Sequence, residues 1–324
     1  MTTEEEVPMM TWRMPAKTPP WSKDFGSMYV NLLGSQTRFV QGKKYRTRVI
    51  EAGQGEPLIL IHGVGGSAEA FFRNVMPLSK DFHVCAIDAL FHGLSSKEPA
   101  DASMDSTGAQ VEHVLDFMDA MGFERAHLCG ESMGAHITFR LALEHPERVG
   151  RIVLNTGHQV NMKRQDFAPQ LKGVDSMALL TRLAVSDPNP ANVRARIEWL
   201  MTTPDRVIDE LVDLRLKFYT IPEARGGIER TGVMNIPRGA NNNAPTQAGQ
   251  VRFEEEDCKK IKAETLVFWT QFNPSNGPDV GEYFASLIPG AKYYCMQDAA
   301  HWPQYEHPEE HDAVITKFIK TGQV

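Results

Sequence analysis

The sequence lacks the features that mark membrane and nucleic-acid-binding proteins. No apolar run reaches the roughly 18 residues of a membrane-spanning helix, and no block of lysine or arginine stands out in a chain whose formal net charge is −7. The N-terminus is acidic and then proline-rich, with no apolar signal core. We therefore expect a cytoplasmic protein whose partner is a small molecule, and neither a nucleic acid nor a membrane.

Cysteine is scarce as well. The four cysteines, Cys85, Cys129, Cys258 and Cys295, lie far apart and form no paired pattern. They indicate free thiols in a reducing compartment rather than a disulfide framework. Apolar residues are plentiful, at 42% of 324 residues, so the chain is able to bury a full core, either as one large domain with an insertion or as two smaller domains.

Strand and helix patterns alternate along most of the chain. Apolar runs of strand length cover 45–53, 57–63, 82–89, 125–130, 148–157, 264–270 and 291–297, and helical patterns cover 105–122, 133–145, 279–288 and the residues from about 308. Between these blocks come amphipathic helices and then a polar, loop-like stretch. The pattern predicts an α/β fold whose mostly parallel sheet is formed by 31–157 and 251–324, with a helical cap at 158–250. Residues 1–30 are expected to form an N-terminal arm.

A serine between two glycines is the first candidate for chemistry. Gly130-Glu131-Ser132-Met133-Gly134 fits the pattern G-x-S-x-G and lies between a predicted strand and a predicted helix. On such a turn the serine adopts a strained backbone conformation, and the glycines leave room for neighbouring elements. The turn would aim the hydroxyl of Ser132 above the sheet, beside the positive end of the helix. The alternative is a loop that simply needs glycine.

Two further segments supply possible partners for this serine. His62-Gly63, at the end of a strand, would place the amide of Val64 opposite the amide of Met133, and the two amides would form an oxyanion hole. His301 follows a strand and precedes the last helix, where a general base reaches the serine from the carboxyl edge of the sheet. A lone histidine is more often structural, but the order serine, acid, histidine favours catalysis.

Two other motifs support competing interpretations. Gly63 and Gly65 after one strand, with Asp88 ending the next, also fit a dinucleotide-binding fingerprint, which leaves the serine turn and the late histidine unexplained. Residues 307–311, HPEEH, match the zinc pattern H-x-x-E-H, but their proline indicates the first turn of a helix, and no distant third ligand is evident. We expect neither a metal nor an organic cofactor.

The segments IHGVGG, CGESMGAH, WTQFNP and AAHWPQYEHPEE together resemble the α/β-hydrolase fold. They are more specifically similar to the meta-cleavage-product hydrolases, which cleave C–C bonds in ring-fission products of aromatic catabolism. The resemblance implies that Gly63, Gly65 and Trp302 contact the substrate and that Arg215, in ELVDLR, grips its terminal 2-oxo-carboxylate. Without the resemblance, Arg215 is one exposed charge on a helix. A homodimer is a further expectation at the level of the family.

The acid of the triad departs from the family pattern. The family resembles W-G-x-x-D or W-T-x-x-D-P where this chain has Asn273, and the alternative acid position of the fold is Asn155. Asn273 is able to accept the Nδ1–H of His301 and fix its tautomer, but it brings no charge to the imidazolium. Three carboxylates remain outside candidates: Asp279, Asp298 and Glu131. The family usually carries Asn in place of Glu131, which either faces solvent or compensates for Asn273.

These features together predict an enzyme that hydrolyses the C–C bond of a 2-hydroxy-6-oxo-dienoate. Ser132 would be the nucleophile, or would at least contact the substrate carbonyl, with His301 as general base and acid and Asn273 as its orienting partner. The nearest alternative is a carboxylesterase or lactonase, which would be indifferent to Arg215→Ala. A cofactor-free dioxygenase or lyase would survive Ser132→Ala, and a non-catalytic ligand-binding member of the fold would show no turnover.

Overall fold

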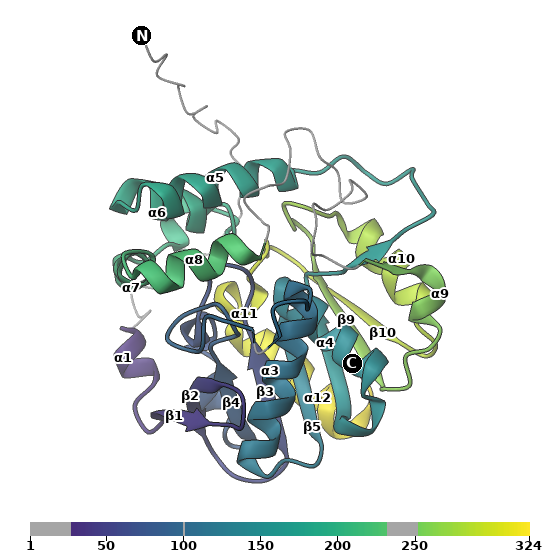
Figure 1. The fold of residues 1–324 in the computed structure, drawn as a ribbon. Coiled ribbons are helices and arrows are strands. Elements are labelled where there is room, and N and C mark those ends of the chain that lie inside the picture. The colour runs from purple at the N-terminus through teal and green to yellow at the C-terminus, as the bar shows by residue number, and fades with distance from the viewer. Residues whose placement is uncertain (1–26, 100, 232–251) are drawn as a thin grey trace.

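The computed structural model describes residues 27–99, 101–231 and 252–324, and an eight-stranded sheet lies at its centre (Figure 1). The spatial order is β1-β2-β4-β3-β5-β6-β9-β10, and β2 alone runs against the other strands. The strands are β1 Gln36–Gln41, β2 Arg46–Ala52, β3 Pro57–Ile61, β4 His83–Ile87, β5 Ala126–Glu131, β6 Val149–Asn155, β9 Thr265–Thr270 and β10 Lys292–Met296. The predicted mostly parallel α/β sheet is confirmed.

Helices cover both faces of this sheet, which is why its inner strands are continuous apolar runs rather than alternating ones. Along β3, Ile59 and Ile61 pack with α3, α4 and α10, whereas Leu58 and Leu60 pack with α2 and α12 on the other face. These helices are α2 Val75–Leu78, α3 Ser106–Met121, α4 Met133–Glu144, α10 Pro278–Leu287 and α12 Pro308–Thr321. Shorter elements are α1 Met28–Asn31, η1 Ala68–Phe71, η2 Pro146–Arg148, α9 Glu255–Cys258 and α11 Pro303–Glu306.

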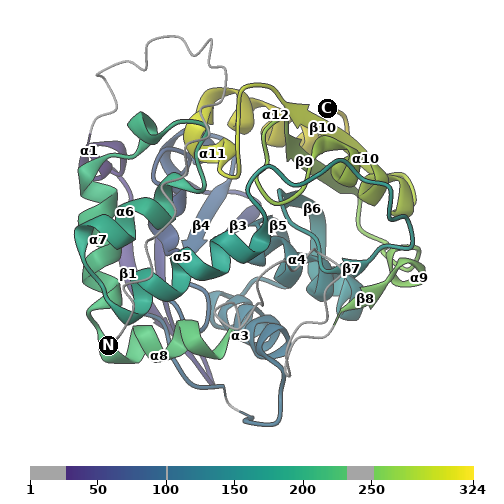
Figure 2. The ribbon, with the colours of Figure 1, turned by 90° about the horizontal axis from the view of Figure 1, so that it is seen from above.

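Four helices lie together over one edge of the sheet, as both views show (Figures 1 and 2). They are α5 Val174–Ser186, α6 Pro190–Glu198, α7 Asp209–Tyr219 and α8 Pro222–Arg230, with η3 Pro204–Arg206 between α6 and α7. All four fall within the stretch predicted to form the cap, whose remaining residues 232–250 lie outside the described part of the chain. Two short strands that the sequence did not predict, β7 Val160–Asn161 and β8 Phe253–Glu254, pair in parallel at the two ends of this stretch.

The cysteines, the helix lengths and the N-terminal segment bear on three expectations from the sequence. All four cysteines are free thiols, three of them buried, as their spacing predicted. Among the described residues, none of the helices combines the length and apolar character needed to cross a bilayer. The predicted N-terminal arm lies outside the described residues up to position 26, and α1 begins at Met28.

Candidate active site

Ser132 sits on the sharp turn between β5 and α4. Its φ is 53°, so the strained conformation predicted from the glycine pattern is confirmed. The glycines on either side are required by close backbone contacts. A Cβ at Gly130 would lie 2.1 Å from the carbonyl oxygen of Gly134, and a Cβ at Gly134 would lie 2.0 Å from that of Ile61. The turn therefore holds only with glycine at both positions.

His301 lies in the loop between β10 and α11 and is buried. Its Nδ1 is 2.8 Å from Oδ1 of Asn273, which follows β9, so the predicted contact between the two residues exists. The ring of His301 packs edge to face on Trp199, with centroids 5.4 Å apart. Burial, with the positive charges of Arg196 and Lys172 nearby, lowers the pKa of His301 to about 3. The imidazole is therefore neutral at neutral pH, with its Nδ1–H donating to Asn273.

Glu131 does not face solvent, so that alternative is wrong. Its side chain is fully buried, with Oε2 accepting the amide N–H of Gly63 at 2.7 Å and Oε1 lying 3.4 Å from Nε2 of His301. The imidazole is thus held between the amide of Asn273 at Nδ1 and a carboxyl group at Nε2. Burial raises the pKa of Glu131 to about 8, although the Gly63 N–H and two arginines act in the opposite direction. At neutral pH the resting pair is mostly uncharged.

The other candidate acids lie elsewhere. Asp279 accepts the amide N–H of Ala168 at 2.7 Å, and Asp298 forms an ion pair of 3.1 Å with Arg206. The side chain of Asn155 points toward Gln304. Of these positions and Glu131, only Glu131 contacts the imidazole.

The predicted oxyanion donors are carried by two segments in direct contact. Met133 is the first residue of α4, so its amide has no acceptor within the helix. Val64 follows Gly63, where a Cβ would lie 2.5 Å from Oε2 of Glu131 and 3.0 Å from Cβ of Ser132. Glu131 therefore ties the loop that carries Val64 to the serine turn through the Gly63 amide. The role of the two amides as oxyanion donors stays a prediction.

Arg215 is not the exposed helix charge of the alternative interpretation. It is 4% exposed, and its guanidinium lies 5.2 Å from the ring of Trp302, the residue after His301. Its Nη1 has no hydrogen-bond partner among the described residues. Across the site, Tyr219 of α7 donates its hydroxyl to the carbonyl of Gly65 at 3.1 Å. Residues of the four-helix layer thus reach both loops that flank Ser132.

A buried glutamate that the sequence analysis did not single out anchors the histidine loop. Glu306 of α11 accepts the amide N–H of Ala300 at 2.6 Å and that of Thr202 at 2.8 Å, and it forms an ion pair of 2.7 Å with Arg206. One carboxylate therefore joins the loop before His301 to the segment between α6 and α7. No local pattern marks this role, because two of the three partners, Thr202 and Arg206, lie about a hundred positions away in the chain.

The residues behind the two competing motifs have structural partners. Asp88 is fully buried, in an ion pair of 3.2 Å with Arg48, and accepts the amide N–H groups of Ala68 and Leu94, both at 2.8 Å. It is therefore not free to bind a ribose as the dinucleotide fingerprint requires. His307 and His311 contact different groups, the carbonyl of Asp298 and the carboxylate of Asp312.

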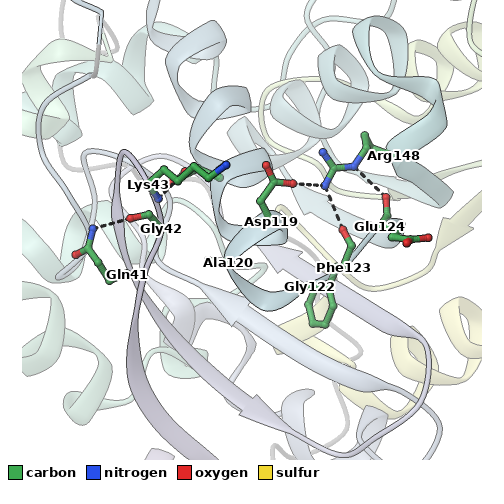
Figure 3. A pocket seen from close by; sticks show the side chains of 10 residues that line it. Gln41, Gly42, Lys43, Asp119, Ala120, Gly122, Phe123, Glu124 and Arg148 are labelled. Atoms are coloured by element: carbon green, nitrogen blue, oxygen red, sulfur yellow. Dashed lines mark hydrogen bonds and ion pairs between the residues drawn. The ribbon is translucent and has the colours of Figure 1, made fainter.

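A hollow of about 800 Å³ lies away from these residues (Figure 3). It is lined by residues that include Gln41, Lys43, Asp119 and Arg148, and the last two form an ion pair of 2.7 Å. Arg148 directly precedes β6, so this hollow is at the amino edge of the parallel strands, whereas Ser132 follows the carboxyl end of β5. Ligands of open α/β sheets bind at the carboxyl edge, which disfavours this hollow as the active site.

Comparison with known proteins agrees with this geometry. A family model described as alpha/beta hydrolase fold matches residues 56–308, and the chain belongs to this family. Within the family, it is 30% identical over 281 residues to the 2-hydroxymuconate semialdehyde hydrolase of Pseudomonas sp. strain CF600, covering 85% of this chain and 90% of the relative.

A second relative is the 2-hydroxy-6-oxononadienedioate/2-hydroxy-6-oxononatrienedioate hydrolase of Paraburkholderia phymatum, 28% identical over 90% of this chain and 95% of the relative. Among solved structures, a variant of the meta-cleavage product hydrolase CumD from Pseudomonas fluorescens IP01 has the same fold, with a TM-score of 0.70 and 24% identity over 90% of this chain and 100% of that one. The resemblance to meta-cleavage-product hydrolases is confirmed.

Proposed function

We propose that this enzyme hydrolyses the C–C bond of a 2-hydroxy-6-oxo-dienoate with Ser132 and His301. The observation that carries the proposal is the arrangement of a strained serine, an imidazole fixed by Asn273, and a buried arginine beside Trp302. The relatives named for substrates of this class support the same activity. Arg215 is suited to bind the 2-oxo-carboxylate end because a guanidinium presents paired donors to a carboxylate.

In this proposal the dienol first becomes a ketone, with the proton of its 2-hydroxyl leaving and a proton arriving at C5. Ser132 then attacks the C6 carbonyl while the neutral imidazole of His301 takes the serine proton. The amides of Val64 and Met133 stabilise the oxyanion. Cleavage of the C5–C6 bond leaves an acyl group on Ser132 and expels a dienolate, which takes the proton from the imidazolium of His301 and becomes a 2-hydroxydienoate. Water activated by His301 releases that group as a carboxylic acid.

Glu131 has a place in these steps because it touches the imidazole. When His301 takes a proton, an ionised Glu131 at 3.4 Å stabilises the imidazolium, which the uncharged Asn273 cannot do. Asn273 keeps the Nδ1–H in place and so fixes the tautomer. The two tasks of a triad aspartate are thereby divided between two residues on opposite sides of the ring.

The second candidate is a carboxylesterase, which would use the same serine and histidine. Among the described residues, Arg215 is buried without a hydrogen-bond partner for its Nη1, which favours the C–C hydrolase because an ester substrate need not carry a carboxylate. A cytoplasmic location and a homodimer stay predictions. The free thiols support the first of them.

The test follows the visible absorbance of a 2-hydroxy-6-oxo-dienoate mixed with the wild type, Ser132→Ala and Arg215→Met. We expect bleaching by the wild type, a loss of at least 1000-fold in Ser132→Ala, and a KM raised at least 30-fold in Arg215→Met. Hydrolysis of nitrophenyl acetate should survive Arg215→Met. Equal bleaching by Ser132→Ala would contradict a serine mechanism, and no bleaching beside rapid ester hydrolysis would identify an esterase.

A further inference from the structure

A second buried arginine lies beside the catalytic histidine. Arg196 of α6 is 2% exposed, and its Nε donates to Oγ1 of Thr181 at 2.8 Å. Its guanidinium lies 5.5 Å from the ring of Trp199, which itself packs on His301. Arg196 therefore lies beside Trp199, which contacts the imidazole, and Arg215 lies beside Trp302, the residue after His301.

Arg196 and Arg215 have no carboxylate in ion-pair contact among the described residues. Nη1 of each guanidinium is also buried without a hydrogen-bond partner in that part of the chain. Burying an unpaired charge is costly, so such a charge needs another explanation than stability. The cost is visible in Arg196 itself, because burial lowers its pKa to about 10. Glu131 is an acid near both, but it is mostly protonated at neutral pH.

The same fold pairs its other deeply buried arginines. Arg48 forms ion pairs with Glu69 and Asp88, and Arg206 forms one with Glu306. Of the four buried arginines in the described residues, the two without an ion-pair partner there are thus the two that flank the Ser132 site. This contrast indicates that their partners are groups of the ligand.

We propose that Arg196 is a second anion-binding residue of the site, and that the substrate is a dianion with one carboxylate on each side of the bond that is cleaved. Arg215 binds the 2-oxo-carboxylate, and Arg196 binds a carboxylate on the fragment that becomes the acyl group on Ser132. The proposal rests on the proposed C–C hydrolase function, which it narrows to dicarboxylate ring-fission products. The positive charges near His301 suit such a ligand.

The activity test compares two 2-hydroxy-6-oxo-dienoates, one with a methyl group at C6 and one with a chain that ends in a carboxylate. We expect the wild type to prefer the dicarboxylate by at least 50-fold in kcat/KM. Arg196→Met should lose this preference, with kcat/KM falling about 50-fold more for the dicarboxylate than for the methyl substrate. Arg194→Met is the matched control, because Arg194 lies on the same helix but is partly exposed and paired with Asp209. It should keep the preference.

A binding test separates this proposal from the proposed function, because it needs no turnover. Isothermal titration of the full chain with adipate and with hexanoate, at equal ionic strength, compares a dianion with a monoanion of the same length. We expect adipate to bind the wild type and Arg194→Met at least tenfold more tightly than hexanoate, and Arg196→Met to bind the two alike. Without ligand, Arg196→Met should melt at the same temperature as the wild type or higher, since it removes an unpaired buried charge.

Three results would overturn the proposal. The first is equal use of the two substrates, or equal binding of the two acids, by the wild type. The second is an equal loss on both substrates in Arg196→Met, which is expected if Arg196 only balances Glu131. The third is a loss of the preference in Arg194→Met as well. If the wild type cleaves neither substrate yet prefers adipate in an Arg196-dependent way, the C–C hydrolase function fails while the dianion site stands.

Discussion

Replacement of Glu131 by glutamine isolates the charge of the carboxyl group that faces the imidazole. The amide oxygen of glutamine still accepts the Gly63 N–H, so the loop keeps its anchor, but the side chain no longer ionises. At the 3.4 Å between Oε1 and Nε2, an effective dielectric constant of about 20 gives an attraction of about 5 kcal/mol for an imidazolium. Desolvation of the carboxylate offsets roughly half of this. The remaining 2 to 3 kcal/mol or so corresponds to a loss of roughly 30- to 150-fold in kcat/KM above the Glu131 pKa of about 8, where the wild-type carboxyl group is ionised.

The pH profile tests the same charge independently. In the proposed mechanism the ionised carboxyl group is the active form, and its pKa is raised to about 8, so kcat/KM of the wild type should rise with pH and level off above that value. Neutral His301, with a pKa of about 3, adds no limb in this range. Glu131→Gln should flatten the rise, and the exposed Glu147→Gln is the control. Activity within threefold of wild type and an unchanged profile would refute the reasoning.

Stability should change in the direction opposite to activity. The folded-state pKa of Glu131 lies above its unfolded value of 4.5, so the folded protein binds more protons and the free energy of unfolding falls as pH rises from 4.5 toward 8. Glutamine does not ionise, so a glutamine at position 131 causes no such fall in the free energy of unfolding. At pH 8, Glu131→Gln should therefore be more stable than wild type by roughly 2 to 5 kcal/mol in urea unfolding, and by less at pH 5. An equal difference at both pH values would contradict the assigned burial.

Three further changes test the neighbouring geometry. Gly63→Ala should lower kcat at least 100-fold, because its Cβ would lie 2.5 Å from Oε2 of Glu131; a normal kcat would show that the loop has room. Asn273→Asp should change turnover less than tenfold, because Glu131 already supplies a carboxylate; a gain of 100-fold or more would mark the native asparagine as a handicap. Arg206→Met should cost about 3 to 5 kcal/mol in urea unfolding, because Glu306 loses its buried partner; a loss below about 1 kcal/mol would speak against that ion pair.

The parts of the molecule that the sequence predicts well are those that depend on local spacing. The serine turn, the strand before it and the helix after it are specified by glycine sterics and apolar periodicity within about twenty residues, and each lies where it was expected. The order of the strands is not local. β2 and β3 are joined by a short turn, yet β4 lies between them, because β3 pairs in parallel with β4 and β5 while β2 pairs with β4 from the other side.

The environment of the charged residues in the site is even less predictable from local sequence than the strand order. Arg196 and Arg194 are two positions apart on α6, but one is buried and the other is partly exposed. Only the packing of the four-helix layer against the sheet decides which of the two faces the site. Glu131 carried one usable signal, because a charged residue at the end of a mostly buried strand has to find a buried partner. Its contact with His301 depends on a loop about 170 positions further along the chain.

In the proposed mechanism, the acid and the amide around His301 together replace the expected aspartate. The family pattern has Asp where this chain has Asn273, and Asn where it has Glu131, so the two kinds of side chain are exchanged across the imidazole ring. The exchange keeps one amide and one carboxyl group on the histidine, and it moves the ionisable group to the side of Nε2, beside the serine turn. An acid there is close to the substrate as well as to the base. In our two proposals, Arg196 and Arg215, whose Nη1 atoms have no hydrogen-bond partner among the described residues, offset the repulsion between the ionised form of Glu131 and an anionic substrate.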